Sequence, residues 1–328
     1  MFIANRRTAL AMFVAGLLSC TSLAAAAQGA ADWPARPLRI LVTNAAGGQT
    51  DQVARVLATR LQQALGQPVV VEPVGGANGM IATTTVAQAA PDGYTLLMTH
   101  GALVQNEALR PKRSYRLEQL RTIAMVATYP IGFAVGTAAG IDSLESWIRH
   151  VKAAPSRFSY ASYGQGSSGH VMGEILKRSA GIDIPHIAYK GGAPAAADLV
   201  AGHVSAAFGA MADLAVHVPG GKVKIVAVTG EARSAKYPDV PTFAEQGFAE
   251  VSLGAFTGVL APAGVPQAVA DRLTREIQQV VGSVEMRAKL DAIGYTPSGL
   301  DAQAFDAYLR ADIQRWREAV KAHGIQIE

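Results

Sequence analysis

The sequence has little charge. Only 16% of its 328 residues are charged, against about 25% in an average globular domain, while 50% are hydrophobic. This composition excludes intrinsic disorder, which requires the opposite balance. The net charge is only +4, from 29 basic and 25 acidic residues, and the basic residues are scattered, which argues against a nucleic-acid partner. The length suits one large domain or two medium ones.

Cysteine is also nearly absent, and the single one, Cys20, lies in a segment typical of a signal peptide. Arg6 and Arg7 precede an uncharged, mostly apolar run, and the alanines of 24–27 provide small residues for cleavage. We expect signal peptide 1–27 to be removed, which leaves 301 of the 328 residues in an exported, periplasmic protein. The mature chain would then have no disulfide, thiolate nucleophile or cysteine metal site.

Two alternatives concern export. The segment Leu17-Leu18-Ser19-Cys20 resembles a lipoprotein cleavage box, so lipid anchoring through Cys20 is the alternative to a free mature protein. The pair Arg6-Arg7 is shared with twin-arginine signals, but the rest of that motif is poor, so we favour the general secretory route.

From Pro37 onward, short apolar runs alternate with glycine turns and amphipathic helices. Leu38–Thr43 is typical of a buried parallel strand, and Thr50 or Asp51 suits the N-cap of a helix that ends at Gly66. The same alternation recurs, with strands expected at Val69–Val71, Tyr94–Met98, Phe158–Tyr163, Ile187–Tyr189 and Val223–Val228. This pattern predicts an α/β fold with mostly parallel sheets.

Two later stretches have no charge for twenty residues, Thr122–Ile141 and Val251–Ala270. Their interior prolines exclude membrane spans, and we expect strands in covered sheets. Because they bracket the middle third, the chain should leave one domain and return to it. We predict domain 1 at 33–128 plus 255–328 and domain 2 at 129–254, with helices near Val269–Val281 and Gln303–His323 closing the chain.

Three glycine loops follow predicted strands, at 47–51, 162–170 and 190–194, and each begins a helix. In open α/β sheets, ligands bind beyond the carboxyl ends of the strands, where helix N-termini present free N–H groups and partial positive charge. The loops combine glycine with hydroxyl and amide donors and hold no cluster of acids. They predict an anion, such as a carboxylate, held by neutral donors.

Enzymatic alternatives have weaker support. Gly164, Gly166 and Gly169 satisfy the dinucleotide pattern G-x-G-x-x-G, but Asp183 precedes the second strand, whereas a ribose-binding acid belongs at its carboxyl end. An exported dinucleotide-dependent enzyme is therefore the alternative function. Neither Ser167 nor Ser168 lies in G-x-S-x-G, no H-E-x-x-H occurs, and the seven histidines lack ligand spacing, so we expect no metal or cofactor.

Several ordered motifs resemble one family from Trp33 to the C-terminus. They are Trp33-Pro34-x-Arg36-Pro37, Ala45-Ala46-Gly47-Gly48-x-x-Asp51, Pro91-Asp92-Gly93-Tyr94-Thr95-Leu96-Leu97, Tyr189-Lys190-Gly191, Pro238-Asp239-Val240-Pro241-Thr242 and Leu260-Ala261-Pro262. The sequence resembles the Bug-type (TctC-like) receptors, extracytoplasmic solute-binding components of tripartite tricarboxylate transporters. This resemblance implies a two-domain Venus-flytrap fold of the periplasmic-binding-protein type II, which closes on a small, usually carboxylated solute.

The resemblance also implies a ligand site made by both domains. Domain 1 would contribute Ala46, Gly47, Gly48, Thr50 and Asp51, and domain 2 would contribute Ser162, Gly166, Ser167, Ser168, His170, Lys190, Gly191, Gly192 and Ala193. Asp213 would contact an amine or hydroxyl, or cap a helix. His170 would contact the anion or cap its loop.

Two segments depart from the family pattern. Thr99 and His100 stand where a hydroxyl-rich turn is common, and Phe256 replaces a tryptophan. His100 would add a ligand donor, while Phe256 would alter one wall or the hinge, or belong to the core.

The implied mechanism is capture without catalysis. The domains would rotate about the strands near Thr128 and Gly254, bury the carboxylate, and dock as a monomer on the transporter's membrane subunits. A ligand sensor for a signalling partner is the other alternative. The choice among mono-, di- and tricarboxylates, amino acids and aromatic acids stays open, because neutral donors recognise the carboxylate alone.

Overall fold

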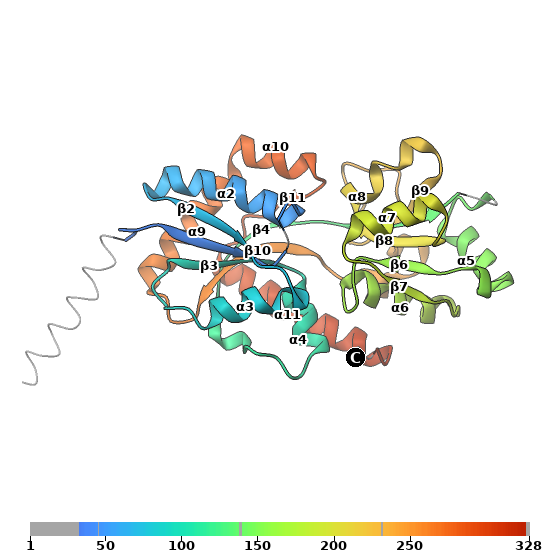
Figure 1. Cartoon of the computed structure of the whole chain (residues 1–328), viewed down its shortest axis with the longest axis horizontal. Coiled ribbons are helices and arrows are strands. Elements are labelled where there is room, and N and C mark those ends of the chain that lie inside the picture. Colours follow the sequence, from blue (N-terminus) through green and yellow to red (C-terminus); the bar gives the residue numbers. More distant parts are fainter. Residues whose placement is uncertain (1–32, 45, 138–139, 231, 326–328) are drawn as a thin grey trace, which may run out of the picture.

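The computed structural model describes residues 33–44, 46–137, 140–230 and 232–325, which form two lobes with one β-sheet each (Figure 1). Lobe 1 contains a six-stranded sheet in the order β11-β4-β10-β3-β1-β2, and lobe 2 contains a five-stranded sheet in the order β7-β6-β8-β5-β9. The α/β prediction is therefore confirmed.

The strands of lobe 1 are β1 (Leu38–Val42), β2 (Val69–Pro73), β3 (Thr95–His100), β4 (Leu120–Thr128), β10 (Phe256–Pro262) and β11 (Thr296–Pro297). Its helices are α2 (Gln49–Leu65), α3 (Met80–Ala87), α4 (Ala102–Leu109), α9 (Gln267–Gly282), α10 (Val284–Ala292) and α11 (Ala302–Ala322).

The strands of lobe 2 are β5 (Ile131–Gly136), β6 (Tyr160–Ser162), β7 (His186–Ala188), β8 (Ala206–Ala210) and β9 (Val223–Val228). Its helices are α5 (Leu144–Ala153), α6 (Ser168–Ala180), α7 (Gly192–Ala201) and α8 (Met211–Ala215). No helix in the described ranges is long and apolar enough to cross a membrane.

Most strands of each sheet share one direction, as predicted, but each sheet also contains an opposing strand. β10 pairs antiparallel with β3 and β4, and β5 pairs antiparallel with β8 and β9. These are the strands by which the chain arrives from the other lobe. The short β11 also runs antiparallel to β4, so both sheets are mixed.

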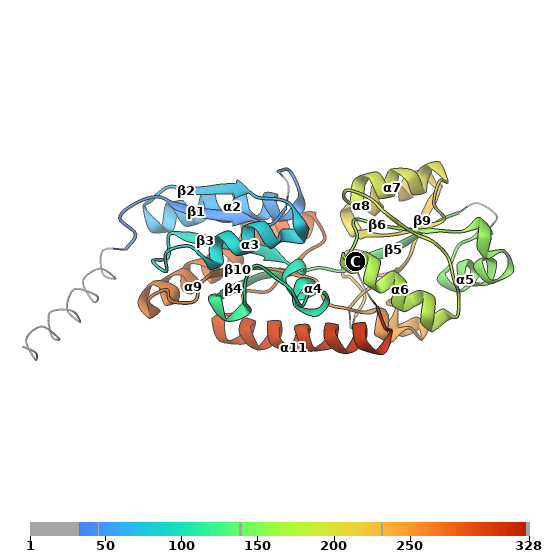
Figure 2. The same ribbon diagram turned by 60° about the horizontal axis from the view of Figure 1, so that its bottom comes forward.

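The two links between the lobes lie side by side. β4 ends at Thr128, which pairs with Phe256 at the start of β10, and the N–H of Tyr129 donates to the carbonyl of Ala255 at 3.0 Å. Helix α11 runs along the lower edge of lobe 1 and ends near α6 of lobe 2 (Figure 2), where Arg178 donates to the carbonyl of Gly324. The lobes are thus joined by adjacent strands and braced by one long helix.

The start of α2 differs from the prediction. Gly48 is the N-cap, while Asp51 lies in the first turn and accepts the N–H of Gly47 at 2.9 Å through Oδ2. An aspartate in the first turn can reach back to a loop donor, so the carboxylate orders the loop without capping the helix. The predicted end is confirmed, because Gly66 adopts a left-handed conformation with φ of 68°.

Candidate functional site

The loop before α2 is ordered from within by Asp51. This residue is 1% exposed, and its Oδ2 accepts from both Gly47 and the guanidinium of Arg55. Within the described residues, no hydrogen bond occupies the N–H of Gly48, Gln49 or Thr50, and Oδ1 of Asp51 is buried without a partner. The exposed Ala46 and Gly47 complete a helix N-terminus that can accept an anion.

The serines of the loop before α6 use their hydroxyls inside the loop. Ser162 donates to the carbonyl of Gly164 and pairs with Nε2 of His186 at 2.7 Å. Ser167 is the N-cap of α6 and accepts the N–H of His170. Ser168 forms a short hydrogen bond with the hydroxyl of Tyr163, which also accepts the N–H of Gly169. These side chains are at most 5% exposed, so they shape the loop.

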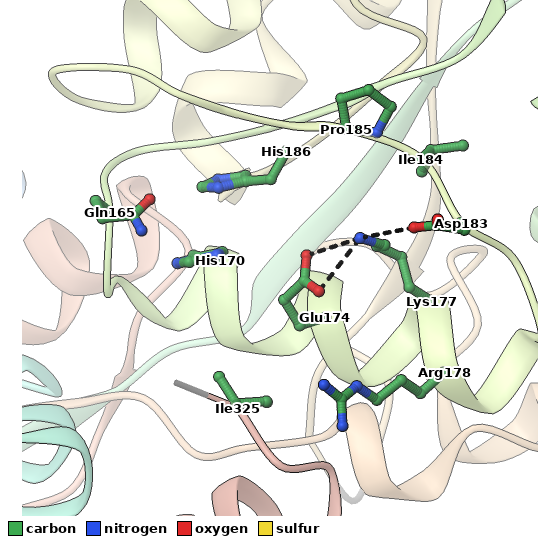
Figure 3. A pocket seen from close by; sticks show the side chains of 10 residues that line it. All are labelled: Gln165, His170, Glu174, Lys177, Arg178, Asp183, Ile184, Pro185, His186 and Ile325. Carbon is green, nitrogen blue, oxygen red and sulfur yellow. Dashed lines mark hydrogen bonds and ion pairs between the residues drawn. The ribbon is translucent and has the colours of Figure 1, made fainter. Parts of the chain in front are cut away.

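His170 caps this loop. Its Nδ1 accepts the N–H of Gly166 at 3.1 Å, and its ring stacks on His186 with centroids 3.9 Å apart (Figure 3). Burial lowers the pKa of both imidazoles, that of His186 to about 3. Both rings are therefore neutral near pH 7, and of the two roles considered for His170 the structure shows the capping one.

The third loop approaches Asp213. Gly191 has a φ of 120°, and a Cβ on Gly192 would lie 2.1 Å from Oδ2 of Asp213, so only glycine lets this carboxyl reach the first turn of α7. Burial raises the pKa of Asp213. Lys190 and Ala193 are exposed, so the lysine is solvated beside the turn in this structure.

Two tyrosines connect these loops. Tyr295, which follows α10, stacks on Tyr129 in the link between the lobes, with centroids 4.3 Å apart and planes at 12°. Its hydroxyl donates to Oε1 of Gln49 at 2.8 Å. Burial raises the pKa of Tyr295, and the neighbouring Asp213 and Tyr163 raise it further. Tyr295 therefore lies where α2, the α6 loop and α8 approach one another.

The sequence pattern assigns no side-chain role to Gln49 or Tyr163, and it does not indicate Tyr129 or Tyr295 as site residues. Gln49 and Tyr163 lie inside the glycine loops, and their polarity beside the glycines was the available signal. Tyr129 and Tyr295 come from distant segments, and no local pattern marks them.

Three other predicted residues have their side chains engaged within lobe 1. Thr99 is fully buried, and its hydroxyl donates to the carbonyl of His100. Nδ1 of His100 accepts the N–H of Ala102, and burial lowers the pKa of His100 to about 4. Phe256 is fully buried and packs edge-on against Phe305 of α11, with centroids 5.5 Å apart. Phe256 therefore belongs to the core of lobe 1. The contacts of Thr99, His100 and Phe256 do not support a role of these residues in ligand binding.

A cavity of about 490 Å³ lies on the flank of α6 (Figure 3). It is lined by Gln165, His170, Glu174, Lys177, Arg178, Asp183, Ile184, Pro185, His186 and Ile325. Lys177 pairs with Glu174 at 3.2 Å and with Asp183 at 3.5 Å. Asp183 is solvent-exposed and precedes β7, so the ribose position of a dinucleotide site has no acid here.

No group of three or more His, Cys, Asp or Glu side chains suited to a metal occurs among the residues that the structure describes. The polar groups at the N-termini of α2, α6 and α7 are backbone N–H groups, hydroxyls, amides, the imidazole of His170 and the carboxyls of Asp51 and Asp213.

Comparison with known proteins agrees with this geometry. The model of the tripartite tricarboxylate transporter family receptor matches residues 53–325. Protein BugT of Bordetella pertussis is 34% identical over 318 residues, which is 96% of this chain and 98% of BugT.

Among solved structures, MatC from Rhodopseudomonas palustris with bound malate is 29% identical with a TM-score of 0.78, over 88% of this chain and all of MatC. A second R. palustris protein, solved with adipate, is 28% identical with a TM-score of 0.82, over 90% of this chain and 99% of that one. The chain therefore belongs to the tripartite tricarboxylate transporter receptor family, to which the Bug-type solute-binding proteins belong.

Proposed function

We propose that this protein is an exported receptor that captures a small carboxylate between its lobes and delivers it to the membrane subunits of a tripartite tricarboxylate-type transporter. The observation that carries the proposal is the position of Tyr295, which binds Gln49 at the start of α2 and lies near Tyr163 of the α6 loop and Asp213 beside α7. No described residue occupies the N–H groups of 48–50 before α2 or of 191–192 before α7. Helix N-termini stabilise anions without a buried cation.

Neutral donors suit capture followed by release. A buried arginine–carboxylate pair would carry a larger desolvation cost and would hold the solute more tightly through bidentate hydrogen bonds. Two structurally similar family members were solved with malate and adipate, which are both dicarboxylates. Dicarboxylates are therefore the first solutes to test.

The proposed movement uses the adjacent links near Thr128 and Gly254. We take 33–128 plus 255–328 as the first moving body and 129–254 as the second. Two adjacent links that run in opposite directions separate these bodies and permit closure by rotation about a short axis. Export would place the mature chain, cut between Ala27 and Gln28, in the periplasm; residues 1–32 lie outside those described.

A thermal-shift screen of chain 28–328 against malate, adipate, citrate, acetate, benzoate, glutamate and NAD tests the proposal. We expect stabilisation by at least one carboxylate, by about 2.7 kcal/mol at a hundredfold excess over Kd, with the solute recovered unchanged. Stabilisation by NAD alone, or turnover of the bound solute, would overturn it.

A further inference from the structure

A loop of lobe 2 reaches across to the end of a helix in lobe 1. Nζ of Lys236 donates to the carbonyls of Asp291 at 3.0 Å and Ala292 at 2.6 Å. These residues form the last turn of α10, where carbonyls lack intrahelical partners and carry partial negative charge. The carbonyl of Asp291 also accepts the N–H of Gly294 at 2.9 Å, so the lysine adds a second donor there. It also supplies a donor to the carbonyl of Ala292, at the end of a helix that belongs to the opposite lobe.

The loop that carries Lys236 is braced. Arg233 forms two hydrogen bonds from Nε to the carboxylate of Glu245 and one from Nη1 to the carbonyl of Pro238. The same carboxylate accepts the N–H of Thr242 at 2.7 Å. Because both ends of the loop are tied together, the position of Lys236 follows the position of lobe 2.

The turn after α10 also faces lobe 2. Gly294 has a φ of 77°, and a Cβ there would lie within 4.0 Å of side-chain atoms of Met211, Lys236 and Tyr237. This turn leads directly to Tyr295, whose hydroxyl holds Gln49, the first residue of α2. The carbonyls that Lys236 binds are therefore only three or four positions before Tyr295 of the candidate site.

An ordinary solvated lysine does not account for these contacts. The partners of Lys236 are two backbone carbonyls of one helix end, and no acid of the described residues lies within ion-pair distance of its Nζ. Lys222 of the same lobe is exposed and has no side-chain partner among the described residues, which makes it a matched control.

We propose that Lys236 is a positioning residue for solute capture: it fastens lobe 2 to the carbonyl end of α10 and thereby holds Tyr295 against the N-terminus of α2. This inference rests on the proposed function for its effect on affinity. Its effect on the distance between the lobes is independent of any solute.

The test uses the mature chain with Ala64→Cys on α2 and Ala197→Cys on α7, both exposed, as sites for spin labels. The sequence has no cysteine beyond Cys20, so labelling is specific. The distance between labels is measured without solute in three further backgrounds, Lys236→Met, Lys236→Arg and Lys222→Met. Malate affinity is then measured by calorimetry in the same proteins.

We expect Lys236→Met to broaden and lengthen the distance distribution and to weaken malate binding by roughly threefold to tenfold, with the melting temperature little changed. Lys236→Arg should retain the distance distribution and the malate affinity of the unmodified protein. Lys222→Met should change neither of these two quantities. An unchanged distribution in Lys236→Met, or an equal change in Lys222→Met, would overturn the proposal. If unmodified protein fails to bind malate, that result bears on the proposed solute, while the distances still decide the role of Lys236.

Discussion

Individual side chains at the candidate site mostly hold backbone in place. Ser162, Ser167 and Ser168 and the imidazole of His170 engage groups of their own loop, so the backbone at the α6 N-terminus is fixed before any solute arrives. Such preorganisation reduces the entropy lost on binding.

Replacing two of these hydroxyls should weaken capture. We expect Ser167→Ala with Ser168→Ala to reduce carboxylate affinity at least tenfold, about the contribution of one charge-assisted hydrogen bond, because the loop loses its N-cap and its bond to Tyr163. Calorimetry of the double variant measures the change. Ser143→Ala, which removes the N-cap of α5 in the same lobe, is the matched control and should leave affinity unaltered.

The buried histidines predict a pH dependence of stability. In the folded protein the pKa values of His100, His170 and His186 lie below 6.5, their ordinary value, so the unfolded chain binds more protons as pH falls. Stability should therefore be constant above about pH 7 and should decline from about pH 6.5 towards pH 5. Melting temperatures across this range measure the slope.

A substitution separates this effect from general acid sensitivity. His186→Gln retains a partner for Ser162 but does not titrate, so the decline should become shallower. His203→Asn, at an exposed histidine of the same lobe whose ring contacts Asp198, provides the slope with which that of His186→Gln is compared. A decline equally steep in His186→Gln would show that His186 is not a source of the effect.

At the scale of the element, the packing of α6 on its sheet depends on two glycines of that helix. A Cβ on Gly173 would lie 2.0 Å from the ring of Tyr160 in β6, and a Cβ on Gly169 would lie 2.9 Å from Cβ of Phe208 in β8. These glycines let the helix lie close to the strands, which places its N-terminus over their carboxyl ends.

Adding a methyl group at this contact should destabilise the fold. We expect Gly173→Ala to lower the free energy of unfolding by about 1–3 kcal/mol, because the ring of Tyr160 is enclosed by the core. Urea denaturation measures the loss. Gly282→Ala, at the end of α9 where a Cβ meets nothing within 4 Å, should be neutral or slightly stabilising, and equal losses in the two variants would refute the packing argument.

Elements with strong apolar periodicity could be predicted from the sequence. Val223–Val228 forms β9 with the predicted bounds, and the helices expected near Val269–Val281 and Gln303–His323 are α9 and α11. Other elements were not predicted, and β8 and α10 are two examples. β8 (Ala206–Ala210) consists of alanine, glycine and one phenylalanine, which have little strand propensity except for the aromatic residue, and α10 carries an exposed Val284 in its first turn.

The candidate site could be predicted as a set of loops but not as a set of contacts. Glycines and hydroxyls mark where a helix N-terminus follows a strand, which is a local property. The direction of each hydroxyl depends on partners such as Tyr163 and His186, and the stack of Tyr295 on Tyr129 joins segments 166 positions apart. Only the tertiary structure brings these groups together.

At the scale of the whole molecule, the low content of charged residues is compatible with anion binding, because backbone N–H groups at helix N-termini carry the partial positive charge. Two lobes joined by adjacent strands present helix N-termini towards one region, while the uncharged stretches of the sequence supply the strands that cross between them (Figure 1). The central claim is that these N-termini hold the solute.

Hydrogen exchange of backbone amides, followed with and without malate or whichever carboxylate the screen identifies, tests this claim most directly. Amides at helix N-termini exchange rapidly unless something occupies them. The account predicts new protection at the unoccupied amides of 48–50 before α2 and of 191–192 before α7, in both lobes together. Protection confined to one lobe, or to the α6 flank around Lys177 and Asp183, would contradict it.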